Sequence, residues 1–386
     1  MMTYNCSTGI TTYSDAESLS DDLGGKIRDN DQKAFQELQK FLNRELQPEL
    51  LPRALYEMSE VYFNGYCGVE RSRQKSFELL QQAADKEDIA AMKKLGKFYQ
   101  DGKQGFKMDA KKALEYFIKI GDSGFPEGYE LAAKLLKEKR GVIDNYGQKV
   151  IDLYQKLVDL ENDDALLEIA EIYTEGFGEV LPDGQVALEI YNELIRGREY
   201  WVKVYKNFKI DSPYLHNYKK ALTEVGRIYK EGRGGIQADG YKAIEFFTKA
   251  EYWDGIADIY QEGKGGVKAD GYKAIEFFTK DEDWLLVGYI YMDGKAGVKA
   301  DGYKAIEYFN KVKNWAGIAK IYQKGIGGVQ QDAQKAVEYH TKDENWEALA
   351  EIYEEGLGDI EPDLEKAQEF RNKADYQFNS IFREVE

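Results

Sequence analysis

Apolar positions in the carboxyl-terminal half of the chain follow a helical period that starts again every 31 residues. In one such unit, four residues fall at i, i+3, i+4 and i+7, which is one face of a helix: Trp284, Val287, Gly288 and Tyr291. Asp283 precedes this face as an N-cap, and Gly294 follows it where a left-handed residue can close a helix. A second apolar pattern begins after Asp301. Each unit is therefore predicted to be a helical hairpin.

The unit recurs along most of the chain, and two repeat lengths are present. The tyrosine that closes the first-helix face returns every 31 residues as Tyr229, Tyr260, Tyr291, Tyr322 and Tyr353. The corresponding positions of the earlier copies are 37 residues apart: Tyr62, Tyr99, Leu136 and Tyr173. The shorter copies lack six residues between the second helix of one unit and the first helix of the next. A fixed period of this size marks a stacked-repeat protein, whose units bury their apolar faces against each other.

A small residue always stands three positions before this tyrosine, although glycine is a poor helix former. The nine copies are Ser59, Gly96, Ala133, Ala170, Gly226, Ala257, Gly288, Ala319 and Ala350. We expect a close approach between helices at this position, because helix propensity alone does not account for the choice.

These motifs resemble two related repeat families. The spacing of Trp284, Val287, Gly288 and Tyr291 is similar to the first-helix signature of the tetratricopeptide repeat. The long glycine loop after Tyr260 is similar to that of the Sel-one-like repeat (SLR) family, and the resemblance covers roughly residues 52–374. It implies an all-α fold, an α-solenoid wound as a right-handed superhelix of about nine helix-turn-helix repeats. It also implies a scaffold, because members of that family mostly bind various protein partners.

The pattern divides the chain into six parts. They are a disordered leader (1–25), an amphipathic capping helix (26–50), four long repeats (51–197), a basic aromatic insertion (198–220), five short repeats (221–376) and an acidic tail (377–386). No charged start followed by an apolar core is visible, and no run approaches the length of a membrane span. We therefore expect a cytoplasmic protein.

Charge indicates the class of partner, and cysteine content indicates the redox compartment. The formal net charge of −17 argues against nucleic acid and anionic membrane surfaces as general partners and favours basic proteins. Only Cys6 and Cys67 are present, so there is no disulfide framework and a reducing compartment is the simpler interpretation. The charge is uneven, because residues 341–386 hold fourteen acidic and five basic side chains. This acidic end is either a solvated cap or an attraction for a basic partner.

The insertion has the opposite character. Residues 196–220 hold seven Lys or Arg and two Asp or Glu, and Trp201, Tyr205 and Lys206 stand at their centre. One interpretation is a longer helix with a turn at Ser212 and Pro213 that joins the two repeat classes. The other is a docking element, because insertions in repeat proteins gather on one face.

Nothing in the sequence indicates catalysis. His216 and His340 are the only histidines, and neither stands in a recognisable metal or nucleophile motif. The glycine loop before Lys273 faintly imitates a phosphate-binding loop, yet it lacks the following Ser or Thr and recurs in several copies. We predict no enzyme, no cofactor and no metal site.

A recognition surface is predicted on the first helices, which by analogy line the concave face. The inward positions, six and two residues before the repeated tyrosine and one after it, vary between copies. Leu285, Tyr289 and Met292 would form an apolar centre, with a polar rim that includes Asp258 and Lys320 and, further along, Arg227. The alternative is that neighbouring repeats cover these three apolar side chains and make them core.

The sequence thus supports an adaptor that binds a protein or peptide on its concave face or at the insertion. An immunity protein that neutralises a toxin by occlusion is the alternative, and a regulator of an associated enzyme is a third hypothesis. The identity of the partner and the oligomeric state do not follow from the sequence.

Overall fold

The computed structural model describes residues 24–44, 50–102, 107–138, 143–208 and 212–383. These residues form 20 α-helices and three short 3₁₀ turns, with no strand among them. The chain divides into two compact units, Met1–Ile172 with Gly176–Leu181, and Tyr173–Glu175 with Pro182–Glu386. The leader predicted at 1–25 lies almost entirely outside the described residues, as do the last three residues of the acidic tail.

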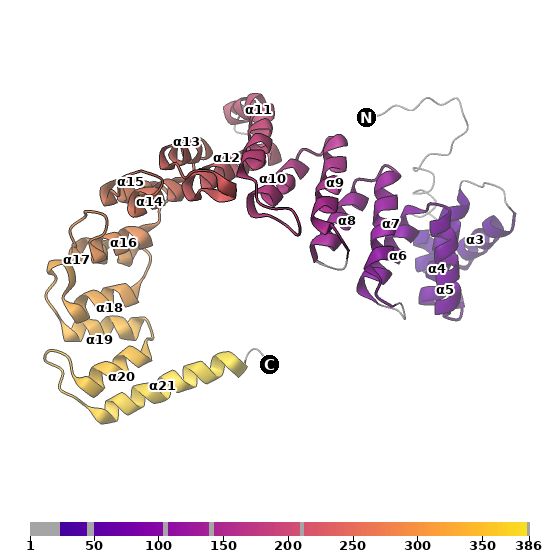
Figure 1. Cartoon of the computed structure of the whole chain (residues 1–386). Helices are drawn as coiled ribbons and strands as arrows, with labels where there is room; N and C mark the ends of the chain where they lie inside the picture. Colours follow the sequence, from indigo (N-terminus) through magenta and orange to yellow (C-terminus); the bar gives the residue numbers. More distant parts are fainter. Residues whose placement is uncertain (1–23, 45–49, 103–106, 139–142, 209–211, 384–386) are drawn as a thin grey trace. The chain divides into compact units, whose positions relative to one another are not determined.

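The first unit begins with two short helices and continues with helical hairpins (Figure 1). Its helices are α2 (Gly25–Arg28), α3 (Gln32–Arg44), α4 (Leu51–Asn64), α5 (Arg73–Asp85), α6 (Ile89–Asp101), α7 (Ala110–Asp122), α8 (Glu127–Glu138), α9 (Tyr146–Asp159) and α10 (Ala165–Glu175), of which the last three residues belong to the second unit. The 3₁₀ turn η3 (Tyr66–Gly68) follows α4. Each of the pairs α4–α5, α6–α7 and α8–α9 packs as a hairpin.

The capping element differs from the prediction, because it is two helices instead of one. The chain turns between α2 and α3, where Asn30 has φ 63°, a left-handed conformation that Asn tolerates. Asp31 then caps α3 by accepting hydrogen bonds from the amides of Lys33 (2.8 Å) and Ala34 (3.3 Å). The amphipathic spacing therefore found the apolar face, and the turn signal Asn30-Asp31 marks the break within it.

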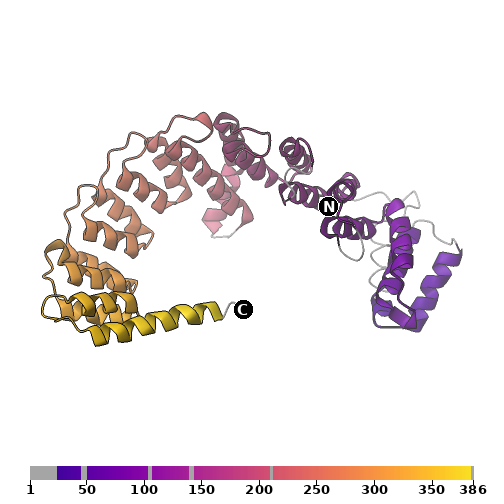
Figure 2. The same cartoon turned by 60° about the horizontal axis from the view of Figure 1, so that its bottom comes forward.

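The second unit contains the short repeats. Its helices are α11 (Gly184–Phe208), α12 (Pro213–Glu231), α13 (Gly240–Ala250), α14 (Trp253–Glu262), α15 (Gly271–Lys280), α16 (Trp284–Asp293), α17 (Gly302–Lys311), α18 (Trp315–Lys324), α19 (Ala333–Lys342), α20 (Trp346–Glu355) and α21 (Leu364–Arg383). Two 3₁₀ turns, η4 (Arg233–Gly235) and η5 (Ile326–Gly328), lie in the glycine loops. Consecutive hairpins from α12 to α19 stack on each other, which Figure 2 shows.

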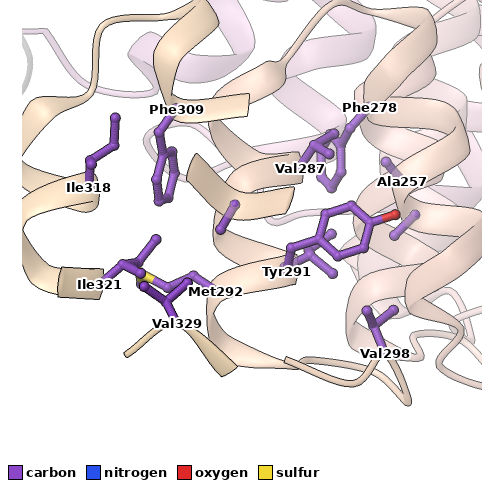
Figure 3. Close-up of a cluster of buried hydrophobic side chains, with 13 residues drawn as sticks. Ala257, Phe278, Val287, Tyr291, Met292, Val298, Phe309, Ile318, Ile321 and Val329 are labelled. Carbon is purple, nitrogen blue, oxygen red and sulfur yellow. The ribbon is translucent and has the colours of Figure 1, made fainter. Parts of the chain in front are cut away.

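In three hairpins of the second unit, a phenylalanine of the second helix fills the centre. Phe247, Phe278 and Phe309 are all fully buried. The small position of the first helix faces this ring, since a Cβ on Gly288 would stand 2.5 Å from Cε1 of Phe309. In the neighbouring copy, Ala257 and Phe278 belong to the same buried cluster (Figure 3). The predicted close approach is confirmed, and it is a helix packed against an aromatic face.

A second layer of rings lies at the rim of each hairpin. In the copy formed by α16 and α17, the ring of Tyr308 stacks on Tyr291 with centroids 5.8 Å apart and on Trp284 with centroids 5.9 Å apart. Lys304 lies over Tyr291 at 4.9 Å, and Lys311 lies over Trp284 at 4.3 Å. The repeated Trp and Tyr therefore clamp one aromatic side chain of the second helix.

The shorter period comes from three adjacent places: the end of the second helix, the turn, and the start of the next helix. Compared with α7 and α8, the copy formed by α13 and α14 is two residues shorter at the end of the second helix, two shorter in the turn, and two shorter at the start of the next helix. The turn of the long copy is Ser123 to Pro126, and that of the short copy is Glu251 and Tyr252. The six residues therefore come from the position that the sequence predicted.

The glycine loops form a seam along one edge of the second unit. The amide of Gly240 donates to the carbonyl of Gly265 in the next repeat (2.8 Å), and Gly271 donates to Ala296 (2.7 Å). No Cβ would fit at Gly240 or Gly271, because the backbone carbonyls of Lys264 and Lys295 occupy that space. The repeated Asp-Gly signature thus serves two contacts, a helix N-cap and a close approach between repeats.

Candidate partner-binding surface

The first helices of the second unit lie on the inner side of its curve. Figure 1 shows α12, α14 and α16 nearer the centre of the curve than α13, α15 and α17. Inward positions of successive first helices also meet, because Nζ of Lys230 on α12 lies 2.8 Å from Oδ2 of Asp258 on α14. The positions predicted from the repeat register therefore share one surface.

The predicted apolar centre is only partly exposed. Met292 is 3 % exposed and belongs to the hydrophobic core, so it offers no surface to a partner. Tyr289 is half-buried, its ring packs edge-on against Phe309 with centroids 5.0 Å apart, and its hydroxyl accepts a 3.4 Å hydrogen bond from Asn314. Leu285 is 38 % exposed. The alternative stated above, that neighbouring side chains cover this group, therefore applies to Met292 and in part to Tyr289.

The polar rim is more engaged than the sequence suggested. Asp258 is held by Lys230 rather than placed against Tyr289. Arg227 pairs with Glu224 on its own helix at 2.7 Å and lies over the ring of Tyr252. Lys320 is exposed and has no ion-pair partner within the described part of the chain.

A cluster of carboxylates lies where α14 meets the turn between α15 and α16. Asp254, in the first turn of α14, contacts Asp281, and the charges of Asp283 and Asp258 act on it as well. Burial, together with the hydrogen bond and charge of Asp281, raises the pKa of Asp254 to about 6. Its Oδ1 atom is buried and has no hydrogen-bond partner in the described residues. Asp258 is paired with Lys230, whereas Asp254 and Asp281 have no ion-pair partner among the described residues, so the joint holds negative charge that ion pairs offset only in part.

The next joint along is apolar. Leu285 and Val312 stand 31 residues after Asp254 and Asp281, so they occupy the same two positions of contact one repeat on. Val312 is 40 % exposed, much like Leu285. We call Leu285 and Val312 the apolar pair and Asp254, Asp258, Asp281 and Asp283 the acidic joint. The sequence reasoning missed Val312, although its replacement of the acid found at Asp281 and Asp343 is visible in the repeat register.

The basic insertion continues a repeat helix. α11 is 25 residues long and runs through the insertion to Phe208, and α12 begins at Pro213. This is the longer helix of the first interpretation. Trp201, Tyr205 and Lys206 lie on α11, and their side chains fall outside the part that the structure describes.

The carboxyl end exposes aromatic groups beside acidic ones. α21 has 20 residues, against 10 in α15, α17 and α19. Tyr376 is 78 % exposed and Phe378 is 63 % exposed on its second half. Asp343, Glu347 and Asp375 line a hollow beside them.

His340 and Cys67 are packed in the interior of the described residues. His340 is buried, takes the phenylalanine position of its repeat and lies 3.3 Å from Oε1 of Gln323. Burial lowers the pKa of this histidine. Cys67 is a buried free thiol. Within the described ranges, no group of three His, Cys, Asp or Glu side chains could hold a metal ion, and no helix is long and apolar enough to cross a bilayer.

Comparison with known proteins identifies the repeats. The Sel1 repeat family matches eight segments, at residues 52–88, 89–125, 163–195, 219–252, 249–280, 285–311, 314–342 and 347–374. The segment between the second and third matches contains the hairpin α8–α9, which carries Leu136 at the tyrosine position. The structure therefore adds one hairpin that the sequence signature alone does not reach.

Similarity to individual proteins is limited. The chain is 36 % identical over 67 residues to the ERAD-associated E3 ubiquitin-protein ligase component HRD3A of Arabidopsis thaliana, a match that spans 17 % of this chain and 10 % of that protein. A Sel1 repeat protein from Oxalobacter formigenes is 16 % identical, with a TM-score of 0.48 over 89 % of this chain and 93 % of the other. An immunity protein from Pseudomonas aeruginosa is 17 % identical, with a TM-score of 0.25 over 61 % and 81 %.

The family matches cover well over half of the chain, and the described helices have the matching all-α repeat architecture. Proteins with these repeats are typically non-enzymatic scaffolds for protein interactions. This chain belongs to the Sel1 repeat family.

Proposed function

We propose that the chain is a scaffold that binds a protein partner on the inward face of α14, α16 and α18, at the apolar pair and the acidic joint beside it. The observation that carries this proposal is the juxtaposition of two exposed apolar side chains with two carboxylates, Asp254 and Asp281, that have no ion-pair partner among the described residues. An apolar centre next to charged groups is the arrangement of a protein interface. The partner is expected to present an apolar side chain flanked by Lys or Arg.

The acidic joint gives the partner's cation a specific role. Asp254 is costly to ionise in the free protein because it is partly buried beside Asp281. A partner lysine or arginine placed beside the two carboxylates would favour their charged forms. Affinity should therefore fall as the pH drops through about 6, the pKa of Asp254, because protonation removes the attraction.

The test uses the full-length protein as bait and then quantifies binding of the purified captured partner. Leu285→Asp and Val312→Asp should each weaken binding by about 2 kcal/mol or more, about 30-fold, if the apolar pair is the centre of the interface. Leu364→Asp is the matched control, because Leu364 is 71 % exposed on α21, away from this surface. Circular dichroism of each variant confirms that the fold is kept.

Three outcomes would contradict the proposal. The first is unchanged affinity of both Asp variants. The second is an affinity that stays constant between pH 7.5 and pH 5.5, and the third is a pH response that survives Asp254→Asn. An immunity protein would use the same surface, and a captured partner whose own toxic activity stops on binding would identify that role.

A further inference from the structure

Three exposed tyrosines stand at the same position of three consecutive repeats. Tyr241, Tyr272 and Tyr303 follow the seam glycines and are 65 %, 61 % and 65 % exposed. The corresponding positions in the flanking repeats of the second unit hold Gln185 and Gln334. These tyrosines lie at the starts of α13, α15 and α17, on the loop edge of the unit.

Lysines alternate with these rings. Lys268 lines one hollow together with Tyr241 and Tyr272, so it stands between them. Lys299 has the same position one repeat on, beside Tyr272 and Tyr303. Both lysines are exposed, and neither has an ion-pair partner within the described ranges. We call Tyr241, Lys268, Tyr272, Lys299 and Tyr303 the tyrosine–lysine strip.

The acids near the strip are already engaged. Asp270 accepts hydrogen bonds from the amides of Tyr272 and Lys273, both at 3.1 Å, and Asp301 caps α17 in the same way. Glu276, one turn further along α15, pairs with Lys280 at 2.9 Å. The hollow beside Lys268 holds two lysines, Lys268 and Lys273, against one acid, Asp270, so the strip has a local excess of positive charge on a protein whose formal charge is −17.

The backbone holds the strip in place. Each tyrosine follows a glycine that is fixed against the loop of the next repeat, through the hydrogen bonds from Gly240 to Gly265 and from Gly271 to Ala296. Binding to a preorganised surface costs less free energy, because fewer of the protein's own groups have to be ordered when the ligand binds. Tyrosine also offers a large contact area with few rotatable bonds, which suits recognition.

We propose that the tyrosine–lysine strip binds an extended acidic segment of a partner protein. An extended chain spans about 3.3 Å per residue, against about 1.5 Å per residue in a helix, so fewer residues reach across the three repeats when the segment is extended. Its side chains would pack on the three tyrosine rings, and its carboxylates would meet Lys268 and Lys299. This site is separate from the inward face, so the two can be tested independently.

Single-stranded nucleic acid is the other polymer that fits alternating rings and cations. The formal charge of −17 disfavours it, because a continuous polyanion is repelled by the rest of the surface, whereas a short run of carboxylates meets only the strip. We therefore argue for the acidic peptide and use an oligonucleotide as a competing probe.

The experiment measures fluorescence anisotropy with the full-length protein and three labelled probes. The probes are a glutamate-rich peptide of about 15 residues, which in extended form reaches about 50 Å, the same peptide with Gln in place of Glu, and oligothymidine. The glutamate peptide should bind at least about tenfold more tightly than the glutamine peptide, and added salt should weaken it. Lys268→Glu with Lys299→Glu should remove this preference, and Tyr272→Ala should weaken binding several-fold.

Matched controls separate the strip from general charge and exposure. Lys97→Glu with Lys111→Glu makes the same change in net charge on exposed helix positions of the first unit. Tyr376→Ala removes a tyrosine that is even more exposed, at 78 %, from α21. Both should bind the glutamate peptide as the unmodified protein does. Equal affinity for the glutamate and glutamine peptides, an unchanged affinity of the strip variants, or tighter binding of oligothymidine would each overturn the proposal.

Discussion

The small position of the first helix allows a direct test of the packing. Gly288 faces the fully buried ring of Phe309, and a Cβ there would stand 2.5 Å from Cε1, whereas ordinary contacts begin at about 3.4 Å. In Gly288→Ala, the ring of Phe309 has to shift slightly, which costs free energy of folding. The better helix propensity of Ala offsets that cost by about 1 kcal/mol. The repeat formed by α14 and α15 shows that a methyl can be accommodated, because Ala257 holds this position above Phe278. We expect little net change for Gly288→Ala.

Leucine adds three further carbon atoms that have no space between α16 and α17. Overpacking of a filled core costs about 1–3 kcal/mol. We expect Gly288→Leu to lie at the upper end, because the Cβ atom alone already requires the ring of Phe309 to shift. Urea unfolding followed by circular dichroism gives the global effect, and hydrogen exchange of α16 and α17 locates it, since repeats lose structure partly independently. Thr279→Leu, on the exposed side of α15, should change stability by about 0.5 kcal/mol or less. A stability of Gly288→Leu equal to that of this control would refute the close-approach argument.

Two further predictions concern buried charge. His340→Phe should raise stability most in acid. Burial lowers the pKa of His340, so the unfolded chain takes up a proton first as the pH falls through about 6.5, and the fold of the unmodified protein loses stability. Urea unfolding at pH 7.5 and 5.5 measures this loss, and a loss in acid that persists in the variant would show that another group causes it. Arg53→Met should cost about 3 kcal/mol, because it removes a cation from two buried carboxylates, Glu57 at 3.3 Å and Asp88 at 3.7 Å. The double variant Arg53→Met with Glu57→Met should regain the part of that loss that comes from Glu57, and a melting temperature as low as that of the single variant would show that Glu57 does not cause it.

The fold was predictable because its signals repeat. The spacing around Tyr291 and the small position at Gly288 each occur in nine copies, so a chance pattern is excluded, and the glycines at this position, Gly96, Gly226 and Gly288, each face a phenylalanine ring. The capping region has only one copy, and there the turn at Asn30 was hidden inside an apolar pattern that continues on both sides of it.

The candidate site was less predictable, because exposure depends on how repeats curve over each other. Register alone placed Leu285 and Met292 on one face, yet the core of the second unit covers Met292 and leaves Leu285 at its surface. Val312 lies in a turn between repeats, where helical periodicity does not predict which way a side chain faces. Comparing equivalent positions across copies would have identified it, since contact between Asp254 and Asp281 implies contact between their counterparts.

The seam of glycine loops sets the mechanical behaviour of the second unit. One edge of the stack is joined covalently by the turns between repeats, and the opposite edge is joined by the hydrogen bonds of Gly240 and Gly271. A ribbon fastened along both edges resists torsion. At α19 the seam glycine is replaced by Ala333, and even a Cβ on Gly358 of the next loop would stand 3.4 Å from the Ala333 methyl group, so the two loops do not approach as closely there. Under tension applied at the carboxyl end, the stack should therefore peel from α20 and α21 inward, with the joints fastened by glycine yielding later and at higher force.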